Sequence, residues 1–322
     1  MTSNTRPIVG LHHVTAIASN PQRNLDFYTQ VLGLRFVKKT VNFDDPGTYH
    51  FYFGDDQGRP GTILTFFPWP HAMRGQRGAG EVVETAYSIH PASLAYWQQR
   101  LATLGVATHT TERFGEAVLQ LEDPDGMPLA LIASDLSAGQ AEAPRFADVP
   151  AQHALRGFHS VTMVQRDADR TAALLAKMGF LEQQREGNRI RYATEGVAAG
   201  HQLDIVLDPA ANRSRLGAGS VHHIAFRAVD EQDQQEWLAL LGREHVVSPV
   251  MDRDYFRSIY FREPGGVLFE LATDAPGFAI DEPLESLGEQ LRVPAWLNSH
   301  LQQIEQALPA VTLTKRSTEE VL

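Results

Sequence analysis

The sequence contains no cysteine among its 322 residues. Disulfide bonds, thiolate ligands and thiol nucleophiles are therefore excluded, and a metal ion would have to bind to His, Asp or Glu. The sequence also has no apolar run of about 18 residues, and its first residues lack the apolar segment of a secretory signal. These absences predict a cytoplasmic protein without a membrane partner.

Positive charge is scarce as well. The chain carries 28 Lys and Arg against 39 Asp and Glu, which gives a net charge of −11. Such a surface repels nucleic acids and anionic membranes on average, so we expect neither as a partner. The hydrophobic content of 43% is that of an ordinary globular protein. A chain of this length usually folds as more than one domain.

A short motif occurs twice. The sequence Gly-Leu-His-His-Val-Thr at 10–15 recurs as Gly-Phe-His-Ser-Val-Thr at 157–162, and each copy precedes a stretch with helical periodicity. Two weaker copies of the unit span residues 82–133 and 220–273. The four predicted helices are 21–32, 92–104, 167–178 and 231–241, and they end at Gly33, Gly105, Gly179 and Gly242.

Turn signals complete each unit. Gly33 and Gly179 suit a position after a helix where φ is positive. Asp-Pro-Asp-Gly at 123–126 and Glu-Pro-Gly-Gly at 263–266 each precede an apolar run that reads as a last strand. We therefore predict an α+β fold of four βαβββ units that form two half-barrel pairs.

The predicted organisation has four parts. An N-terminal pair of units occupies residues 1–135, and a linker rich in Ala, Pro and Gln occupies 136–154. A C-terminal pair of units follows at 155–274. The tail, 275–322, is punctuated by proline and contains one helical stretch around 295–307, so we expect it to pack as a lid or a brace.

Two adjacent histidine pairs and one glutamate suggest chemistry. His12-His13 and His222-His223 each lie in a β-branched run, and Glu270 lies in an otherwise apolar strand, where a carboxylate is costly unless it is paired or binds a metal. Two histidines and one carboxylate are the ligand set of an open non-haem iron site. Because successive side chains of a strand face opposite sides, only one histidine of each pair can be a ligand.

Two different triads fit the repeat. In the first strands of the units, we align His159 and His223 with His13. His13, His223 and Glu270 would meet if the first and fourth units pair. His159 would replace His13 if the third and fourth units pair. Composition and spacing allow both arrangements.

A fixed offset from a turn glycine locates the equivalents of Glu270. This residue lies four positions after Gly266, and the same offset gives Thr65, Ala130 and Asp204 in the other units. Among these three, only Asp204 could be a metal ligand. We interpret it as part of a solvated turn and predict no second metal site.

Several longer motifs resemble those of one family. Over residues 8 to 310 the chain is similar to the iron-dependent hydroquinone ring-cleaving dioxygenases of the vicinal oxygen chelate superfamily, which includes glyoxalases, bleomycin resistance proteins and extradiol dioxygenases. The resemblance implies the vicinal oxygen chelate fold. The motifs are Leu11–Thr15, Arg35–Lys39, Pro60–Leu64, Val221–Ala225, Asp252–Tyr255, Ser258–Arg262 and Pro264–Glu270.

The resemblance also implies a site. It places Fe(II) on His13, His223 and Glu270, and this ligand set favours pairing of the first and fourth units. The isolated protein could carry Mn or Zn in place of iron. His159 and Asp204 would then have no part in the site. The catalytic residues that the resemblance implies are His12, Thr15, His222, Arg253 and Tyr260.

The implied activity is insertion of O₂ into a hydroquinone-type ring next to a hydroxyl-bearing carbon, so the partners would be a small aromatic molecule and O₂. Tyr260 and His222 would handle the phenolic proton, and Arg253 would stabilise negative charge.

Two other functions compete with this one. The first is a glyoxalase-like lyase or isomerase with Zn or Ni and more protein ligands. The second is a metal-free protein that sequesters small molecules.

Simpler interpretations apply to some of these residues. Arg253 lies between Asp252 and Asp254, so it could form only a surface ion pair, and Tyr260 could be ordinary core. An aromatic cluster in the first unit could form the wall of a pocket, although we expect core packing for most of its members. It consists of Phe51, Phe53, Phe66, Phe67 and Trp69.

The oligomeric state is a separate question. Exposed sheet edges make a homo-oligomer possible.

Overall fold

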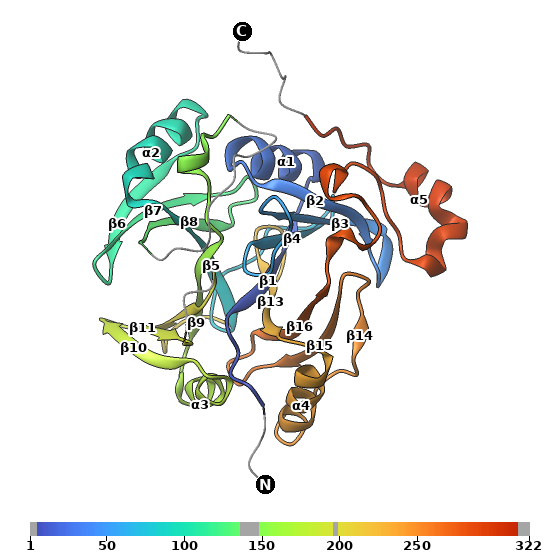
Figure 1. Cartoon of the computed structure of the whole chain (residues 1–322). Coiled ribbons are helices and arrows are strands. Elements are labelled where there is room, and N and C mark those ends of the chain that lie inside the picture. Colours follow the sequence, from blue (N-terminus) through green and yellow to red (C-terminus); the bar gives the residue numbers. More distant parts are fainter. Residues whose placement is uncertain (1–4, 136–147, 196–198, 315–322) are drawn as a thin grey trace.

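The computed structural model describes residues 5–135, 148–195 and 199–314, and two curved eight-stranded sheets dominate it (Figure 1). The first sheet consists of β1 (Leu11–Ala18), β2 (Arg35–Asn42), β3 (Asp45–Gly54), β4 (Ile63–Pro68), β13 (Val221–Ala228), β14 (Met251–Asp252), β15 (Phe256–Arg262) and β16 (Leu268–Pro276). The second consists of β5 (Glu81–Ile89), β6 (Thr108–Arg113), β7 (Glu116–Glu122), β8 (Pro128–Ala133), β9 (Phe158–Gln165), β10 (Leu181–Glu186), β11 (Arg189–Ala193) and β12 (Gln202–Leu207).

The strand order shows which units pair. It is β14-β15-β16-β13-β1-β4-β3-β2 in the first sheet and β10-β11-β12-β9-β5-β8-β7-β6 in the second. The first sheet therefore joins the first unit to the fourth, and the second sheet joins the second unit to the third. This arrangement confirms the predicted α+β fold of four units in two half-barrels.

The predicted helices are present. The glycines that end the first and third, Gly33 and Gly179, have φ of 73° and 96°, as their role in ending a helix requires. The α-helices are α1 (Pro21–Asp26), α2 (Leu94–Thr103), α3 (Asp169–Met178), α4 (Glu231–Leu241) and α5 (Leu301–Ala307). A π-helical turn (Phe27–Val31) extends α1, and 3-10 turns lie at Pro91–Ser93, Ala151–His153, Phe278–Ile280, Leu284–Ser286 and Ala295–His300.

Alternation along the strands separates two interiors. Val14 and Ile224 belong to the main core, which also contains helix side chains such as Trp97 and Trp237. The helices therefore pack on one face of the sheets. Residues next along the strands, such as Ala225, face the hollow of the first half-barrel, where a smaller apolar cluster lies. The hollow is consequently free to hold a site.

Two crossings between the sheets bring the first and fourth units together. The connection from β4 to β5 and that from β12 to β13 lie side by side, with bridges from Arg74 to Ala218 and from Gln76 to Arg215. The predicted linker, 136–154, connects β8 to β9 within the second sheet, and its residues 136–147 lie outside the described part of the chain.

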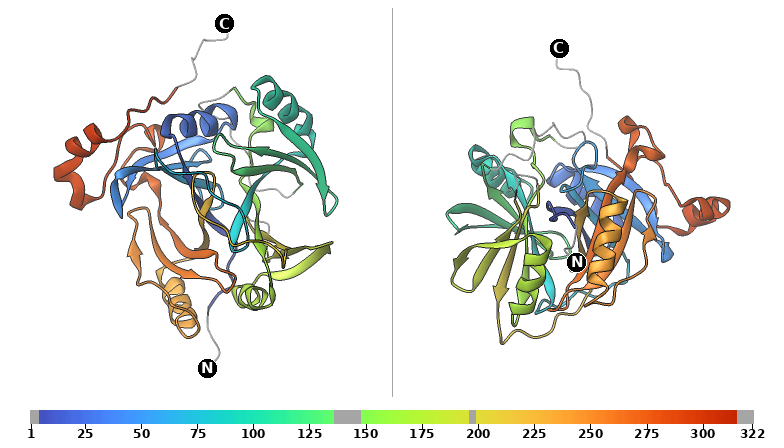
Figure 2. Two further views of the ribbon diagram at one scale, coloured as in Figure 1. Left: turned by 180° about the vertical axis from the view of Figure 1, so that it is seen from behind. Right: turned by 60° about the horizontal axis from the view of Figure 1, so that its bottom comes forward.

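The tail braces the first sheet, and its last eight residues, 315–322, lie outside the described part (Figure 2). The fully buried Lys38 of β2 pairs with Asp281, at 2.6 Å, and with Glu282. A bridge between Lys39 and Leu291 continues the contact along the edge of β2. The tail thus covers an edge that would otherwise be open to another strand.

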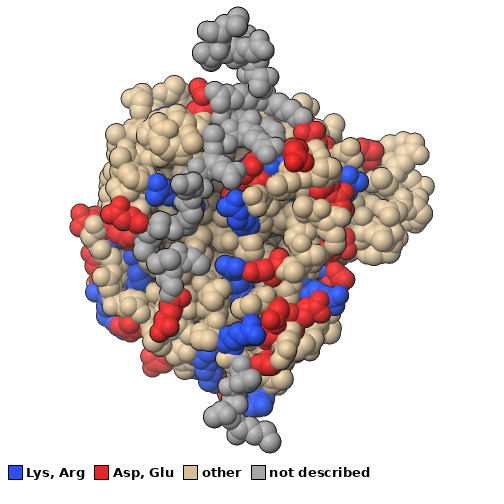
Figure 3. All heavy atoms as spheres, viewed as in Figure 1, with Lys and Arg blue, Asp and Glu red and all other residues tan. Residues whose placement is uncertain are grey.

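Charged side chains of both signs lie on the surface. On the face shown in Figure 3, acidic and basic side chains are interspersed. Within the described residues, no helix combines the length and the apolar character needed to span a bilayer.

Candidate metal centre

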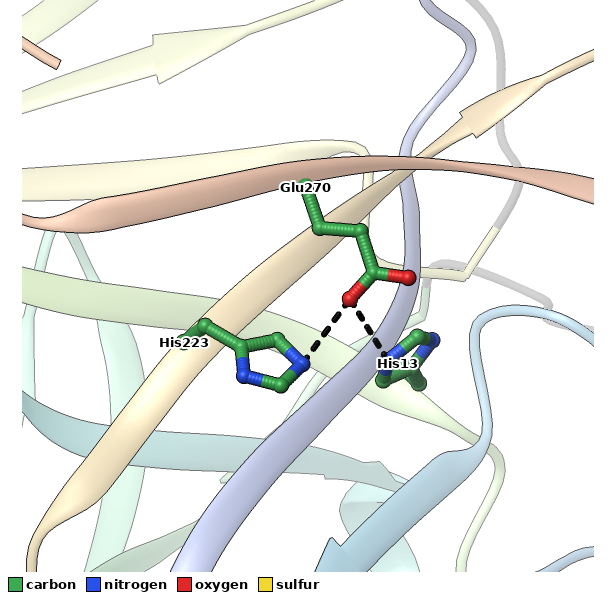
Figure 4. Close-up of side chains that lie close together, drawn as sticks. All are labelled: His13, His223 and Glu270. Carbon is green, nitrogen blue, oxygen red and sulfur yellow. Dashed lines mark ion pairs between the residues drawn. The ribbon is translucent and has the colours of Figure 1, made fainter. Parts of the chain in front are cut away.

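Three side chains from neighbouring strands of the first sheet converge (Figure 4). His13 lies on β1, His223 on β13 and Glu270 on β16, and all three are buried. The Nε2 atoms of His13 and His223 lie 3.3 and 2.9 Å from Oε2 of Glu270. One ligand atom from each residue lies within 4.8 Å of the others, which is close enough for a single metal ion.

The electrostatics of Glu270 fit a cation. Its Oε1 accepts a hydrogen bond from the Ser258 hydroxyl, whereas its buried Oε2 accepts none. Burial alone would raise the pKa of Glu270, but interactions with His13 and His223 outweigh burial and hold it well below its usual value. A buried carboxylate oxygen without a hydrogen bond, facing two imidazole nitrogens, is a donor set that a divalent metal satisfies.

The first histidine of each pair lies within hydrogen-bond distance of the second. His12 Nδ1 lies 2.9 Å from His13 Nδ1, and His222 Nδ1 lies 2.8 Å from His223 Nδ1. Burial, followed by the charge of the adjacent histidine, lowers the pKa of His12 well below its ordinary value and that of His222 to about 3. A neutral His12 or His222 can accept a hydrogen bond at Nδ1 from Nδ1–H of the second histidine, and in that tautomer Nε2 of the second histidine is free to bind a metal.

A cavity of about 320 Å³ opens in front of the triad. Two of the three candidate ligands, His13 and His223, line it, and most of its other walls are aromatic or polar. The lining residues are His13, Asn42, Phe43, Asp44, His50, Tyr52, Phe67, Trp69, His222, His223, Arg253, Phe256, Tyr260 and Leu268.

Arg253 and Tyr260 form one side of the cavity. Arg253 Nε donates to the Tyr260 hydroxyl at 3.2 Å, and the guanidinium also pairs with Asp44 at 3.4 Å. Burial, and then the charge of Glu270, raises the pKa of Tyr260, so its phenol is protonated at neutral pH. Since Tyr260 accepts from Arg253, its own O–H remains a donor.

The interpretation of Arg253 as a surface ion pair with its neighbours is wrong. Its side chain is only 17% exposed and contacts Asp44 and Tyr260. Asp252 instead accepts a hydrogen bond from the backbone of Asp254, whose φ is +63°. This turn directs Arg253 inward.

Thr15 is buried and does not line the cavity. Its hydroxyl accepts from Thr65 at 2.9 Å, and Thr65 lies 2.8 Å from His50 Nε2. His12 is likewise buried and contacts the cavity lining through His13 and Phe256. Thr15 and His12 therefore influence the site through neighbours.

His159 lies in the other sheet. It is on β9, and its Nε2 is 3.1 Å from Glu116, so it cannot replace His13. The first and fourth units form the cluster, as the resemblance implies. The alignment of His159 with His13 is also wrong by one residue, because matching strand registers place Ser160 at the position of His223.

The interpretation of Asp204 as part of a solvated turn is wrong. Asp204 lies on β12, is only 1% exposed and accepts hydrogen bonds from Arg189 and Arg191. These guanidinium groups satisfy the carboxylate inside the second half-barrel.

The aromatic cluster divides as expected. Phe51, Phe53 and Phe66 belong to the main core, whereas Phe67 and Trp69 line the cavity. Most of the cluster therefore packs the interior, and two members form a wall of the pocket.

Sequence reasoning missed His50, Tyr52 and Ser258. His50-Phe-Tyr-Phe in β3 matches Ser258-Ile-Tyr-Phe in β15, and in both strands the first and third residues face the hollow while the others face the core. The shared Tyr-Phe pair at alternating positions was a signal that could have found them.

Comparisons with known proteins agree with the fold. A profile described as "Glyoxalase/Bleomycin resistance protein/Dioxygenase superfamily" matches residues 10–131 and 157–271. A Bacillus subtilis protein named "Putative ring-cleaving dioxygenase MhqO" is 46% identical over 302 residues, which are 93% of this chain and 96% of that protein. A Sphingobium indicum protein named "Chlorohydroquinone/hydroquinone 1,2-dioxygenase" is 38% identical over 297 residues, which are 89% of this chain and 91% of that protein.

A solved structure is also similar. The crystal structure of a "putative dioxygenase" from Bacillus subtilis has a TM-score of 0.92 and 44% sequence identity, and it covers 97% of this chain and 100% of that one. The profile match covers well over half of the residues, and the relatives align almost end to end. The chain belongs to the glyoxalase, bleomycin resistance protein and dioxygenase superfamily.

Proposed function

We propose that this protein is an Fe(II)-dependent ring-cleaving dioxygenase that acts on a hydroquinone-type ring. The observation that carries the proposal is a buried triad of two histidines and one carboxylate that faces an aromatic-lined cavity. The names of the two relatives, a ring-cleaving and a hydroquinone dioxygenase, support the same class of reaction.

His13, His223 and Glu270 would hold the iron. Fe(II) in such a site would supply open coordination positions and a path for electrons from the ring to O₂. The fit rests on the unsatisfied Oε2 of Glu270 and on the two imidazole nitrogens that face it.

The remaining residues would act on the substrate. Tyr260 can donate a hydrogen bond to a phenolic oxygen, and Arg253 beside it would stabilise negative charge on that oxygen. His222 lines the cavity and stays neutral, so with Nδ1 accepting from His223 its Nε2–H can donate to a ligand. The walls formed by Phe67, Trp69 and Phe256 would exclude water from an aromatic ring.

The geometry disfavours the two rivals. A lyase with more protein ligands would need a further donor, yet the residue of the first unit that corresponds to Glu270 is Thr65, which is not a carboxylate. A metal-free binding protein would leave the buried Oε2 of Glu270 and the two buried imidazoles that face it with only one another as partners.

One experiment separates these functions. Protein purified without oxygen and loaded with Fe(II) is mixed with hydroquinone while O₂ uptake and ultraviolet absorbance are recorded. We expect uptake of one O₂ for each ring cleaved and a new absorbance from the opened product. Bound Zn without uptake would support the lyase, and failure to bind any metal would support the binding protein.

A further inference from the structure

The cavity has a second polar side that faces the side formed by Tyr260. In the first sheet, Tyr52 on β3 pairs with Thr65, just as Tyr260 on β15 pairs with Glu270. Tyr52 is therefore the counterpart of Tyr260 in the first unit. The two phenols approach the hollow from opposite edges of the central strand pair, and both line the cavity.

Tyr52 begins a chain of hydrogen bonds. Its hydroxyl lies 2.9 Å from Nδ1 of His50, and the two rings pack with their centroids 4.1 Å apart. His50 Nε2 lies 2.8 Å from the Thr65 hydroxyl, which donates to Thr15 at 2.9 Å. Both ring nitrogens of His50 are engaged, so the imidazole is held in one orientation and in turn holds Tyr52.

The direction of this chain follows from its donors. Because the Thr65 hydroxyl donates to Thr15, Nε2–H of a neutral His50 donates to Thr65, and Nδ1 of His50 accepts from Tyr52. The Tyr52 oxygen is then left to accept a hydrogen bond from a ligand hydroxyl. Burial, the main cause, raises the pKa of Tyr52 well above its ordinary value, which keeps the phenol neutral.

Other tyrosines near the site differ in their partners. Tyr49 donates to the backbone carbonyl of Pro309, and Tyr255 donates to Asp281, so both serve the packing of the tail. Tyr52 instead bonds to an imidazole that also lines the cavity. Tyr52 is thus hydrogen-bonded to a residue of the cavity wall, whereas Tyr49 and Tyr255 are hydrogen-bonded to the tail.

We propose that Tyr52, positioned by His50, binds the second hydroxyl of a hydroquinone, the one that does not face the triad of His13, His223 and Glu270. The inference rests on the proposed function and names the feature of the substrate that the first unit recognises. A ring with two hydroxyls would meet one polar group on each side, Tyr260 and Tyr52, whereas a phenol with one hydroxyl would leave Tyr52 without a ligand partner.

The test is binding without turnover. Fe(II)-loaded protein is titrated in the absence of O₂ with hydroquinone and with phenol, and the dissociation constants are measured by calorimetry. We expect the wild type to bind hydroquinone about tenfold more tightly than phenol, as one neutral hydrogen bond allows. Tyr52→Phe and His50→Gln should weaken hydroquinone binding about tenfold and leave phenol binding unchanged.

Two further variants serve as controls. Tyr49→Phe, on the same strand but outside the cavity, should change neither constant. Tyr260→Phe should weaken both ligands by the same factor, because that residue would face the hydroxyl that both share. Equal losses for hydroquinone and phenol in Tyr52→Phe would overturn the subsite, as would equal affinities in the wild type. Absence of O₂ uptake with hydroquinone in the wild type would instead reject the proposed function.

Discussion

The two half-barrels neutralise buried carboxylates in different ways. Strand registers match four inward positions, which hold His13, His223, Glu270 and Thr65 in the first sheet and Glu84, Ser160, Asp204 and Ala130 in the second. At these positions the first half-barrel has one carboxylate, which two imidazoles face. The second contains two carboxylates at these positions and satisfies them with arginines.

The arginine network is extensive. Arg113 and Gln120 donate to Glu84, and Arg189 and Arg191 donate to Asp204. Arg191 also donates to Glu116 at 2.6 Å. In this half-barrel the guanidinium groups of the arginines supply the positive charge that the buried carboxylates need. In the first half-barrel two imidazoles face the carboxylate instead, an arrangement that a cation from solution would complete. This difference separates a structural interior from a candidate active site.

The largest expected effect is the loss of metal in one half-barrel only. His13→Ala removes one of three ligands, so we expect Fe(II) affinity to fall by more than about 100-fold. His159→Ala, in the other half-barrel, should leave it unchanged. Iron content after dialysis measures both. If His159→Ala lost iron and His13→Ala retained it, the metal site would lie in the second half-barrel and not in the first.

The next effect concerns the matched carboxylates. Asp204→Asn should lower the free energy of unfolding by about 4 kcal/mol, because it leaves Arg189 and Arg191 without their buried partner. Glu270→Gln in the metal-free protein should cost less than about 1 kcal/mol, since the amide can still bond to Ser258. Urea denaturation at pH 7 measures the difference. Equal losses would show that the two interiors are not distinct.

Acid should affect the second half-barrel through Glu116. Burial would raise the pKa of this residue, but His159 and Arg191 lower it to about 2. Because its pKa is depressed in the folded state, Glu116 stabilises the protein above its unfolded pKa of about 4.3, and that contribution disappears as the pH falls toward 2.

Denaturation at pH 7, 5 and 3 tests this linkage. We expect Glu116→Gln to be about 2 kcal/mol less stable than the wild type at pH 7 and to lose most of that difference at pH 3. The exposed Glu112→Gln is a matched control that should follow the wild type. A difference that stays constant with pH would exclude the charge of Glu116 as its cause.

The smallest effect separates catalysis from metal binding. Tyr260→Phe should keep iron and stability but lower kcat about tenfold, because it removes a donor beside Arg253. Tyr87→Phe, a buried tyrosine of the second sheet, should leave kcat unchanged. Steady-state O₂ uptake compares them. An unchanged rate in Tyr260→Phe would remove this residue from the mechanism.

Much of the fold was predictable from the sequence, because the repeated strand, helix and glycine signals are local. The choice between His13 and His159 was not, since it depends on which strands meet across the sheet and spacing carries no information about that. The resemblance to a family decided it, and the strand order agrees.

The polar network around Tyr52 was harder to predict. The β3–β4 connection contains eight residues, from 55 to 62, whereas the β15–β16 connection contains five, from 263 to 267, so a constant offset along the chain cannot align Tyr52 with Tyr260. Asp204 was misread because its arginine partners lie on a neighbouring strand and reach it only after folding.

The crossing of the chain between sheets determines the order in which the two half-barrels can form during synthesis. The strands of the second sheet run without interruption from Glu81 to Leu207, so they can pair as soon as they leave the ribosome. The first sheet, whose strand β1 carries His13, is complete only after β16, which ends at Pro276. Translation must therefore pass Glu270 before the candidate metal centre exists, and a chain that ends between Leu207 and Glu270 would have a complete second sheet and no site.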